Sequence, residues 1–190
     1  MKQIEGFKTV EAIKDTPPCV LPKGAYEMII LGVTLNEGKS GRYLQFDMDV
    51  SAGEHKGFFD NLYKTSTAEI KNWRCKYFVS IPEETGADKD MYKLRLFKTF
   101  ITHIEESNTG YAWDWNEANL KGKRIGGLFV DNEYLDKNGE RRMGTVMAKT
   151  CTIQDVIDGT YKMPKDRLLP EAPSGFVAVD KMNTAELPFS

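Results

Sequence analysis

The chain has 190 residues, 41% of them hydrophobic, so it can bury a core, and its length favours one domain. A formal net charge of −2 and a pI near 5.8 exclude a global attraction to nucleic acid or to anionic membranes, so any such binding must come from a local patch. No window of about 18 apolar residues occurs, and the first six residues lack the apolar core of a signal peptide. We therefore expect a soluble, intracellular protein that does not associate with membranes.

Cysteine and histidine usage argues against metal and redox chemistry. Cys19, Cys75 and Cys151 are widely spaced and odd in number, unlike a disulfide framework or a set of metal ligands. His55 and His103 have no partner at a metal-ligand spacing, and the chain contains no glycine-rich phosphate loop and no nucleophile elbow. We expect reduced thiols, no cofactor and no enzymatic activity.

The N-terminal third predicts a short arm followed by a meander of three strands. Residues 1–20 carry a weak helical pattern that ends at two prolines. Apolar and polar residues alternate over residues 44–50, which is typical of a strand with one buried face. Glycine-containing links at 37–41 and 52–57 fit tight connections. The strands are expected at residues 26–36, 42–52 and 57–64.

Residues 73–81 alternate again and predict a further strand. Trp73 and Cys75 fall on one of its faces, and Arg74, Lys76 and Phe78 fall on the other. If this strand joins the sheet, it presents cations and an aromatic ring side by side.

A helix is expected after this strand, from an N-cap at Asp90 to a glycine stop at Gly110. Its apolar positions recur every three or four residues, at Met91, Leu94, Phe97, Ile101 and Ile104. The aromatic residues within 111–115 are interpreted as a plug against this helix, with a base-stacking platform as the alternative.

The C-terminal third predicts a hairpin, a short helix and a tail. Strands at 124–135 and 140–150 flank an Asn-Gly turn, and Gly126 and Gly127 suggest a bulge or bend in the first of them. A threonine cap at residue 152 predicts a short helix that ends the folded part. From residue 160 onward, prolines and scattered apolar residues indicate an extended tail.

Three meandering strands, a helix and a final hairpin is the element order of the OB-fold, a five-stranded, partly open barrel. We therefore expect an all-β protein with one main helix: an OB-like barrel with the helix between its third and fourth strands. The division is a mobile N-terminal arm at 1–20, an OB-like domain at 21–159 and an extended C-terminal tail at 160–190. A β-sandwich of similar strand count with a packed helix is the alternative.

In an OB barrel, ligands bind across strands two and three and in the loops between strands one and two and between strands four and five. Basic residues gather at these places and aromatic residues are interleaved with them. A cationic groove with rings on which bases stack is what non-specific single-strand binding requires. The candidate DNA-binding residues are Lys39, Arg42, Tyr43, Lys56, Lys64, Trp73, Arg74, Lys76, Phe78, Arg141 and Arg142.

An ordered set of short motifs across roughly residues 20–160 resembles a family of phage and prophage proteins catalogued as a domain of unknown function. These motifs lie at residues 21–27 (LPKGAYE), 43–44, 53–59 (GEHKGFF), 97–102 (FKTFIT), 106–115 (ESNTGYAWDW) and 120–123 (LKGK). Members of that family are encoded in replication and recombination modules and are regarded as single-stranded DNA-binding proteins with an OB-like fold. The resemblance implies the same fold and function here, in the cytoplasm of a bacterial host.

The end of the chain adds a second resemblance. Glu186 followed by Leu187, Pro188 and Phe189 looks like the acidic tip by which bacterial and phage single-strand binders recruit replication and repair enzymes. The tip of those proteins is densely acidic, whereas residues 160–190 here hold four basic and four acidic side chains, and Ser190 follows the phenylalanine. A partner-binding motif and a frayed C-terminus both remain open as interpretations.

The sequence thus predicts a non-enzymatic single-stranded DNA-binding protein that acts in replication or recombination. Its partners are single-stranded DNA and, through the tail, replication or recombination proteins, and its oligomeric state is left open. The alternative is an adaptor or inhibitor that uses the same barrel to bind a host replication or defence protein.

Overall fold

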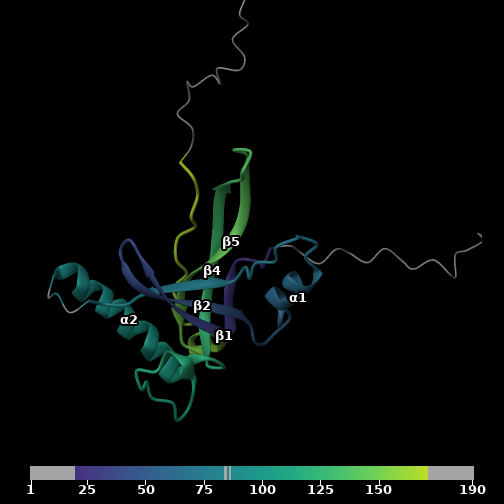
Figure 1. Ribbon diagram of the computed structural model, residues 1–190. Coiled ribbons are helices and arrows are strands. Elements are labelled where there is room, and N and C mark those ends of the chain that lie inside the picture. Colours follow the sequence, from purple (N-terminus) through teal and green to yellow (C-terminus); the bar gives the residue numbers. More distant parts are fainter. Residues whose placement is uncertain (1–19, 84, 86, 171–190) are drawn as a thin grey trace, which may run out of the picture.

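The structure, a computed structural model, describes residues 20–83, 85 and 87–170. These residues are mostly β, with one five-stranded antiparallel sheet and three α-helices (Figure 1). In the described residues no helix is long and apolar enough to cross a membrane. The elements are β1 (Gly24–Gly38), β2 (Gly41–Val50), α1 (Phe58–Thr65), β3 (Lys76–Ser80), α2 (Asp88–Ser107), a 3-10 turn η1 (Glu117–Leu120), β4 (Arg124–Leu135), β5 (Arg141–Cys151) and α3 (Ile153–Asp158).

β1 is the central strand of the sheet. Its first half pairs with β4, from Gly24 opposite Phe129 to Ile29 opposite Arg124, and its second half pairs with β2. The strand order is β3-β2-β1-β4-β5, so β3 and β5 are the two edges. The sheet is therefore open and not closed into a barrel. The described residues form a single sheet, so the alternative prediction, a β-sandwich of two sheets, is wrong for them.

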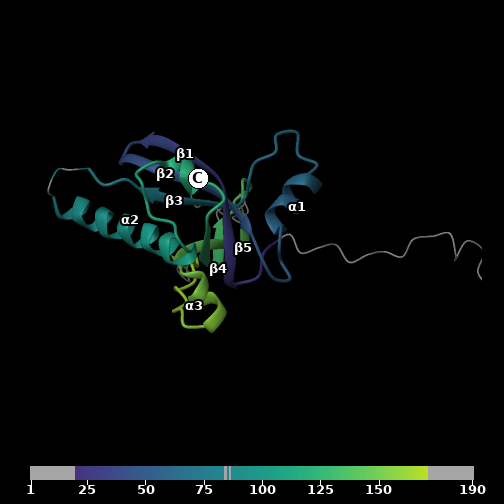
Figure 2. The ribbon, with the colours of Figure 1, turned by 90° about the horizontal axis from the view of Figure 1, so that it is seen from below.

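The core lies between one face of the sheet and α2. Phe46 and Met48 of β2 are fully buried, and the ring centroid of Phe46 lies 4.7 Å from that of Phe100 of α2. Burial of a large apolar side chain of this kind is worth about 1.5–3 kcal/mol. α2 follows β3 in the chain and contacts β3, β4 and β5, and Figures 1 and 2 show it alongside the sheet.

Residues 57–64 were predicted to form a strand, but all of them except the N-cap residue Gly57 lie in helix α1. The carboxylate of Asp49, near the end of β2, accepts hydrogen bonds from the backbone N–H groups of Phe59 (2.9 Å) and Asp60 (3.1 Å). The first N–H groups of a helix lack partners within the helix, so a carboxylate that accepts from them stabilises the helix start. The prediction was wrong because this cap comes from a residue ten positions before Phe59.

β3 is shorter than the strand predicted at 73–81, but the predicted alternation is confirmed. Cys75 and Val79 are buried, whereas Arg74 and Phe78 are exposed. The strand therefore presents one face to the core and the other to solvent.

α2 begins before the predicted cap at Asp90, and its N-cap residue is Ala87. Asp90 is instead buried inside the first turn, where its carboxylate accepts a hydrogen bond from the Thr85 hydroxyl. The predicted apolar stripe is correct in its C-terminal half only. Phe97, Ile101 and Ile104 are buried, but Met91 and Leu94 are exposed.

The hairpin of β4 and β5 around the Asn-Gly turn is confirmed. A bulge or bend was predicted at Gly126 and Gly127, and the register shift of β4 lies just after them, between Leu128 and Phe129. The glycines serve close packing: a Cβ on Gly126 would lie 2.6 Å from the Cys151 Sγ atom.

The predicted short helix after β5 is confirmed as α3. The Thr152 hydroxyl accepts from the Asp155 N–H (3.0 Å), and the Asp155 carboxylate accepts from the Thr152 N–H (3.0 Å). This reciprocal pair is the capping box that the threonine predicted.

Residues 166–169 lie against β4. The Arg167 N–H donates to the Asp131 carbonyl (2.9 Å), and the Glu133 N–H donates to the Arg167 carbonyl (2.8 Å). Asp166 forms an ion pair with Lys23 at 2.6 Å. The first part of the segment predicted as a tail thus contacts the sheet as far as residue 170.

Candidate functional site

The side of β2 and β3 that faces away from the core forms a continuous polar and aromatic surface, which we call the outer face. Antiparallel pairing sets Gln45 opposite Phe78 and Asp47 opposite Lys76, and strand alternation turns their side chains away from the buried residues between them. The outer face consists of Tyr43, Gln45, Asp47, Lys76, Phe78 and Ser80.

Two predicted stacking residues meet on the outer face. The ring centroids of Tyr43 and Phe78 lie 5.9 Å apart with an interplanar angle of 63°. Phe78 is 55% exposed although it is a large apolar residue in the middle of a strand. An exposed ring held by a strand offers a flat surface on which a base can stack.

A shallow groove of about 380 Å³ continues this surface beside β1 and β2, and we call it the outer groove. The Trp73 indole donates a hydrogen bond from Nε1 to the Met48 carbonyl (2.9 Å), which fixes its ring at the wall of the groove. Tyr63, near the end of α1, packs on Trp73 with ring centroids 5.7 Å apart. The Lys71 Nζ atom lies 5.8 Å from the Tyr63 ring centroid. The groove is lined by Leu31, Gly32, Asp47, Tyr63, Lys71, Asn72, Trp73 and Lys76.

The structure therefore brings together four of the predicted DNA-binding residues: Tyr43, Trp73, Lys76 and Phe78. Arg74 is exposed in the segment that leads into β3. Of these five positions, Tyr43 lies in β2 and the other four lie within residues 73–78.

The other predicted cations of the N-terminal half are not on the outer face. Lys39 is exposed in the β1–β2 turn, and Lys56 is exposed in the turn before α1. Lys64 is exposed on α1 and forms an ion pair with Asp60 at 2.5 Å. Arg42 belongs to the row of β2 that includes Leu44, so it lies on the opposite side of the strand from Tyr43.

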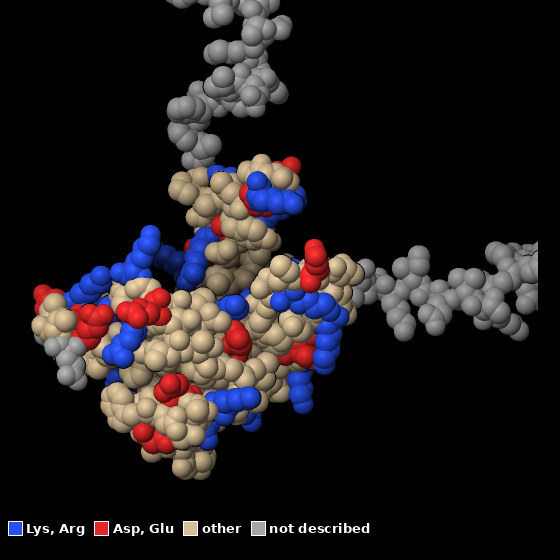
Figure 3. Space-filling model, viewed as in Figure 1, with Lys and Arg blue, Asp and Glu red and all other residues tan. Residues whose placement is uncertain are grey.

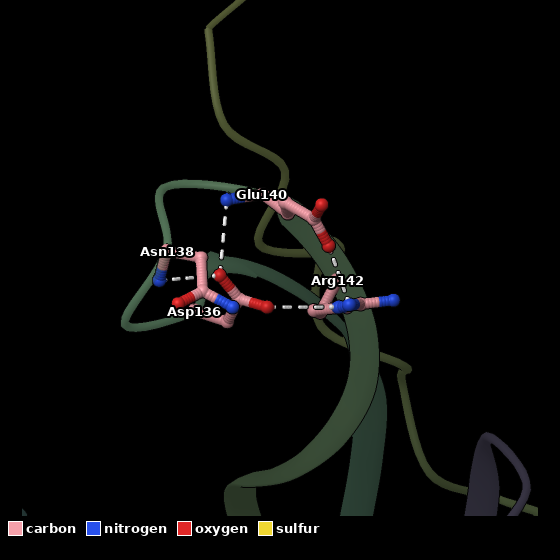
Figure 4. Close-up of polar contacts among 4 residues, drawn as sticks. All are labelled: Asp136, Asn138, Glu140 and Arg142. Carbon is pink, nitrogen blue, oxygen red and sulfur yellow. Dashed lines mark hydrogen bonds and ion pairs between the residues drawn. The ribbon is translucent and has the colours of Figure 1, made fainter.

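Arg141 and Arg142 lie at the base of the β4–β5 turn and bind carboxylates there. Arg142 contacts Asp136 through Nε (3.1 Å) and Glu140 through an Nη atom (2.5 Å), as Figure 4 shows. Arg141 pairs with Glu133 at 3.1 Å. Blue and red atoms accordingly lie side by side at the tip of this hairpin in Figure 3. These ion pairs offset the positive charge that the prediction assigned to phosphate binding.

Asp136 also organises the hairpin turn itself. Its carboxylate accepts the backbone N–H groups of Asn138 (2.8 Å) and Glu140 (3.0 Å). These hydrogen bonds, more than the contact with Arg142, hold the pKa of the Asp136 carboxyl below its usual value. The turn is thus built as a self-contained polar unit.

A larger hollow of about 850 Å³ opens beside α2 on the core side of the β1–β2 hairpin. Its apolar wall includes Met91 and Leu94 and the indole of Trp115, which is 77% exposed and stacks on Phe97 at 6.5 Å. Trp113, by contrast, is partly buried against the core, as the plug prediction expected. The charged side chains that line this acidic hollow are Arg42, Glu83, Asp90 and Glu117.

The part of the chain that the structure describes holds no cluster of potential metal ligands, and its two cysteines are buried. In these residues no group of three or more histidine, cysteine, aspartate or glutamate side chains is placed to hold a metal ion. Cys75 and Cys151 are buried free thiols, and burial raises the pKa of the Cys75 thiol above its usual value and that of Cys151 to about 11. Cys19 and the predicted partner-binding residues Leu187, Pro188 and Phe189 lie outside the described residues.

Tyr63 and Lys71 were not among the predicted site residues, because a single tyrosine is more often a core residue and a loop lysine is usually only solvated. Once residues 58–65 form a helix, Tyr63 turns back onto Trp73. The helical spacing of Phe59, Leu62 and Tyr63 was the signal that could have placed it.

No protein-family model matches the chain, and no curated protein matches it. The resemblance to the phage family therefore stays a prediction, and the function must be argued from the geometry of the outer face and its surroundings.

Proposed function

We propose that the protein binds single-stranded DNA without sequence specificity across the outer face of β2 and β3. One observation carries the proposal: the exposed ring of Phe78, packed on the partly buried ring of Tyr43, lies beside Lys76 and a groove walled by Trp73. A contiguous exposed apolar surface marks a binding site more than an isolated exposed side chain does. The phage-family resemblance would place this activity in DNA replication or recombination in a bacterial cytoplasm.

The fold supports the location of this site. Five antiparallel strands that open between β3 and β5, with α2 after β3, are compatible with an OB-like domain. OB domains bind oligonucleotides on the face of their second and third strands. In this protein those strands are β2 and β3, the strands that carry the outer face.

The mechanism assigns separate roles to the cations and to the rings. Lys76, Lys71 and Arg74 neutralise phosphates, which releases condensed counterions and makes binding salt-dependent. Phe78 and Tyr43 stack on bases, at about 1–3 kcal/mol for each base. Neither interaction reads the hydrogen-bonding edge of a base, so the affinity is tolerant of sequence.

The test is a titration of a fluorescently labelled oligothymidylate with the whole protein, followed by anisotropy at low and at moderate salt. We expect binding that weakens as salt rises and that duplex DNA of the same length does not displace. Absence of binding at low salt would overturn the proposal.

The acidic hollow favours a second candidate function, a protein-interaction adaptor. Its exposed Trp115 and Met91 offer an apolar surface, and its carboxylates Glu83, Asp90 and Glu117 would repel phosphates. Such a site fits a peptide with an apolar anchor and flanking basic residues. The test is binding of synthetic peptides of this kind to the wild-type protein and to Trp115→Ala. Peptide binding that is lost in Trp115→Ala, in a protein that does not bind single-stranded DNA, would favour the adaptor.

A further inference from the structure

The open sheet leaves a seam between its two edges. β3 and β5 end the strand order, and α2 bridges them because it contacts both. A groove of about 510 Å³ lies along this seam, and we call it the seam groove. Its walls come from three elements: β3, which contributes Phe78, α2, which contributes Tyr92, and β5, which contributes Lys149.

The charge of the seam groove is opposite to that of the acidic hollow. Its charged lining residues are Lys89, Lys93 and Lys149, and among the described residues that line it none is an aspartate or a glutamate. Lys93 lies 3.8 Å from Asp90 and is largely buried, so its charge is partly offset. Lys89 and Lys149 are exposed on opposite walls, where they can contact the phosphates of one polyanion.

The groove also carries exposed apolar side chains that the core does not use. Tyr92 is 63% exposed and Leu96 is 51% exposed. They occupy one stripe of α2 with His103, at spacings of four and seven residues, and this stripe faces the seam and not the core. A ring flanked by lysines is the same combination that the outer face presents.

Phe78 connects the two surfaces. It belongs to the outer face, where it packs on Tyr43, and it also lines the seam groove. The backbone of β3 is available along the same path. The Ile81 N–H donates to the Arg42 carbonyl, and the Cys75 carbonyl accepts from the Met48 N–H, so the backbone groups of the odd-numbered residues of this segment point toward β2. Because the direction alternates along a strand, the backbone N–H groups of Lys76 and Phe78 point the other way, toward the seam.

We infer that the seam groove is the continuation of the single-strand path: a strand that crosses the outer face turns over the edge of β3 at Phe78 and enters the seam. There Lys89 and Lys149 bind phosphates and Tyr92 stacks on a base. This inference rests on the proposed function, since it extends the same ligand from one surface to the next.

The test compares a short and a long oligothymidylate, of about 4 and about 16 nucleotides, which are the limits of the site sizes known for OB folds. The variant is Tyr92→Ala combined with Lys149→Ala, and both side chains are exposed enough to be removed without loss of core packing. The matched control is Tyr134→Ala combined with Lys137→Ala, which removes an exposed ring and an exposed lysine from the β4–β5 hairpin.

We expect the seam variant to weaken binding of the long strand at least about tenfold and that of the short strand less than about twofold, because the short strand occupies the outer face alone. The control should leave both affinities unchanged. Unchanged affinity of the seam variant for the long strand, or an equal loss for both lengths, would overturn the inference while the proposed function stands. Failure of the wild-type protein to bind either length would overturn the proposed function, and the inference with it.

Discussion

Tyr43 of β2 and Phe78 of β3 meet edge to face on the solvent side of the sheet, with ring centroids 5.9 Å apart. They are diagonal neighbours, because Gln45 is the residue directly opposite Phe78. The contact holds the two rings in place, while Phe78 remains more than half exposed. Binding a base at such a site therefore costs little conformational entropy.

Replacement of one lysine and one arginine distinguishes a cation that forms no ion pair among the described residues, Lys76, from one that does, Arg142. Lys76→Ala should lower the magnitude of the slope of log K against log salt by about 0.7, the value for one phosphate contact to a single strand. Arg142→Ala should leave the slope unchanged, since Asp136 and Glu140 already bind its guanidinium. Titrations at three or more salt concentrations measure both slopes, and a larger change for Arg142→Ala would refute the assignment.

Asp49→Ala should destabilise the protein by about 1–3 kcal/mol, because it leaves buried N–H groups at the start of α1 without an acceptor. Urea unfolding gives the free energy of unfolding, and hydrogen exchange at Phe59 should accelerate. Asp60→Ala is the control. It removes only a surface ion pair with Lys64, worth about 0.5 kcal/mol. Equal losses for the two variants would contradict the capping role of Asp49.

Gly126→Ala should destabilise the protein by about 1–3 kcal/mol through overpacking. The new methyl group would lie 2.6 Å from both the Cys151 Sγ atom and the Thr152 carbonyl oxygen. At Gly144 the nearest atom to such a methyl group is a Tyr134 ring carbon at 3.4 Å, an ordinary contact. Gly144→Ala should therefore be tolerated, and thermal unfolding of the two variants would show whether the difference exists.

Stability should fall as pH drops through the range in which His103 takes up a proton. Burial lowers the pKa of the His103 imidazole, and the nearby carboxylates of Glu106 and Asp155 only partly oppose this shift. The unfolded chain then binds the proton more readily than the folded chain. The contribution of His103 is thus fully present above the ordinary histidine pKa of about 6.5 and is lost progressively below it.

The measurement for His103 is the urea midpoint as a function of pH in the wild-type protein and in His103→Gln. Carboxylates that titrate at lower pH are common to both proteins, so the difference isolates the imidazole. A wild-type curve that falls no more steeply than the variant curve between pH 6.5 and 5 would contradict the prediction.

Local patterns in the sequence were sufficient wherever one element carries its own signal. The alternation around Phe46 and the Asn-Gly turn near Gly139 placed their strands correctly, and Thr152 placed α3. These signals act over two to four residues, so no knowledge of the tertiary structure was required.

The predictions failed where a distant residue decides the local structure. Asp49 caps α1 across the end of β2, and no pattern within residues 57–64 reveals that acceptor. The ion pairs of Arg141 and Arg142 were not predicted because they depend on the hairpin register, and DNA binding by these two residues stays a prediction. Tyr92 was overlooked because α2 carries two apolar stripes, and only the packed structure shows which of them faces the core.

The most direct test of the central claim compares Phe78→Ala with Trp115→Ala. Each change removes one exposed ring, the first from the outer face and the second from the acidic hollow. In anisotropy titrations of a labelled oligothymidylate, Phe78→Ala should cost about 1–3 kcal/mol of binding free energy and Trp115→Ala should cost almost none. A loss confined to Trp115→Ala would contradict the account, because the strand would then bind at the acidic hollow and not across β2 and β3.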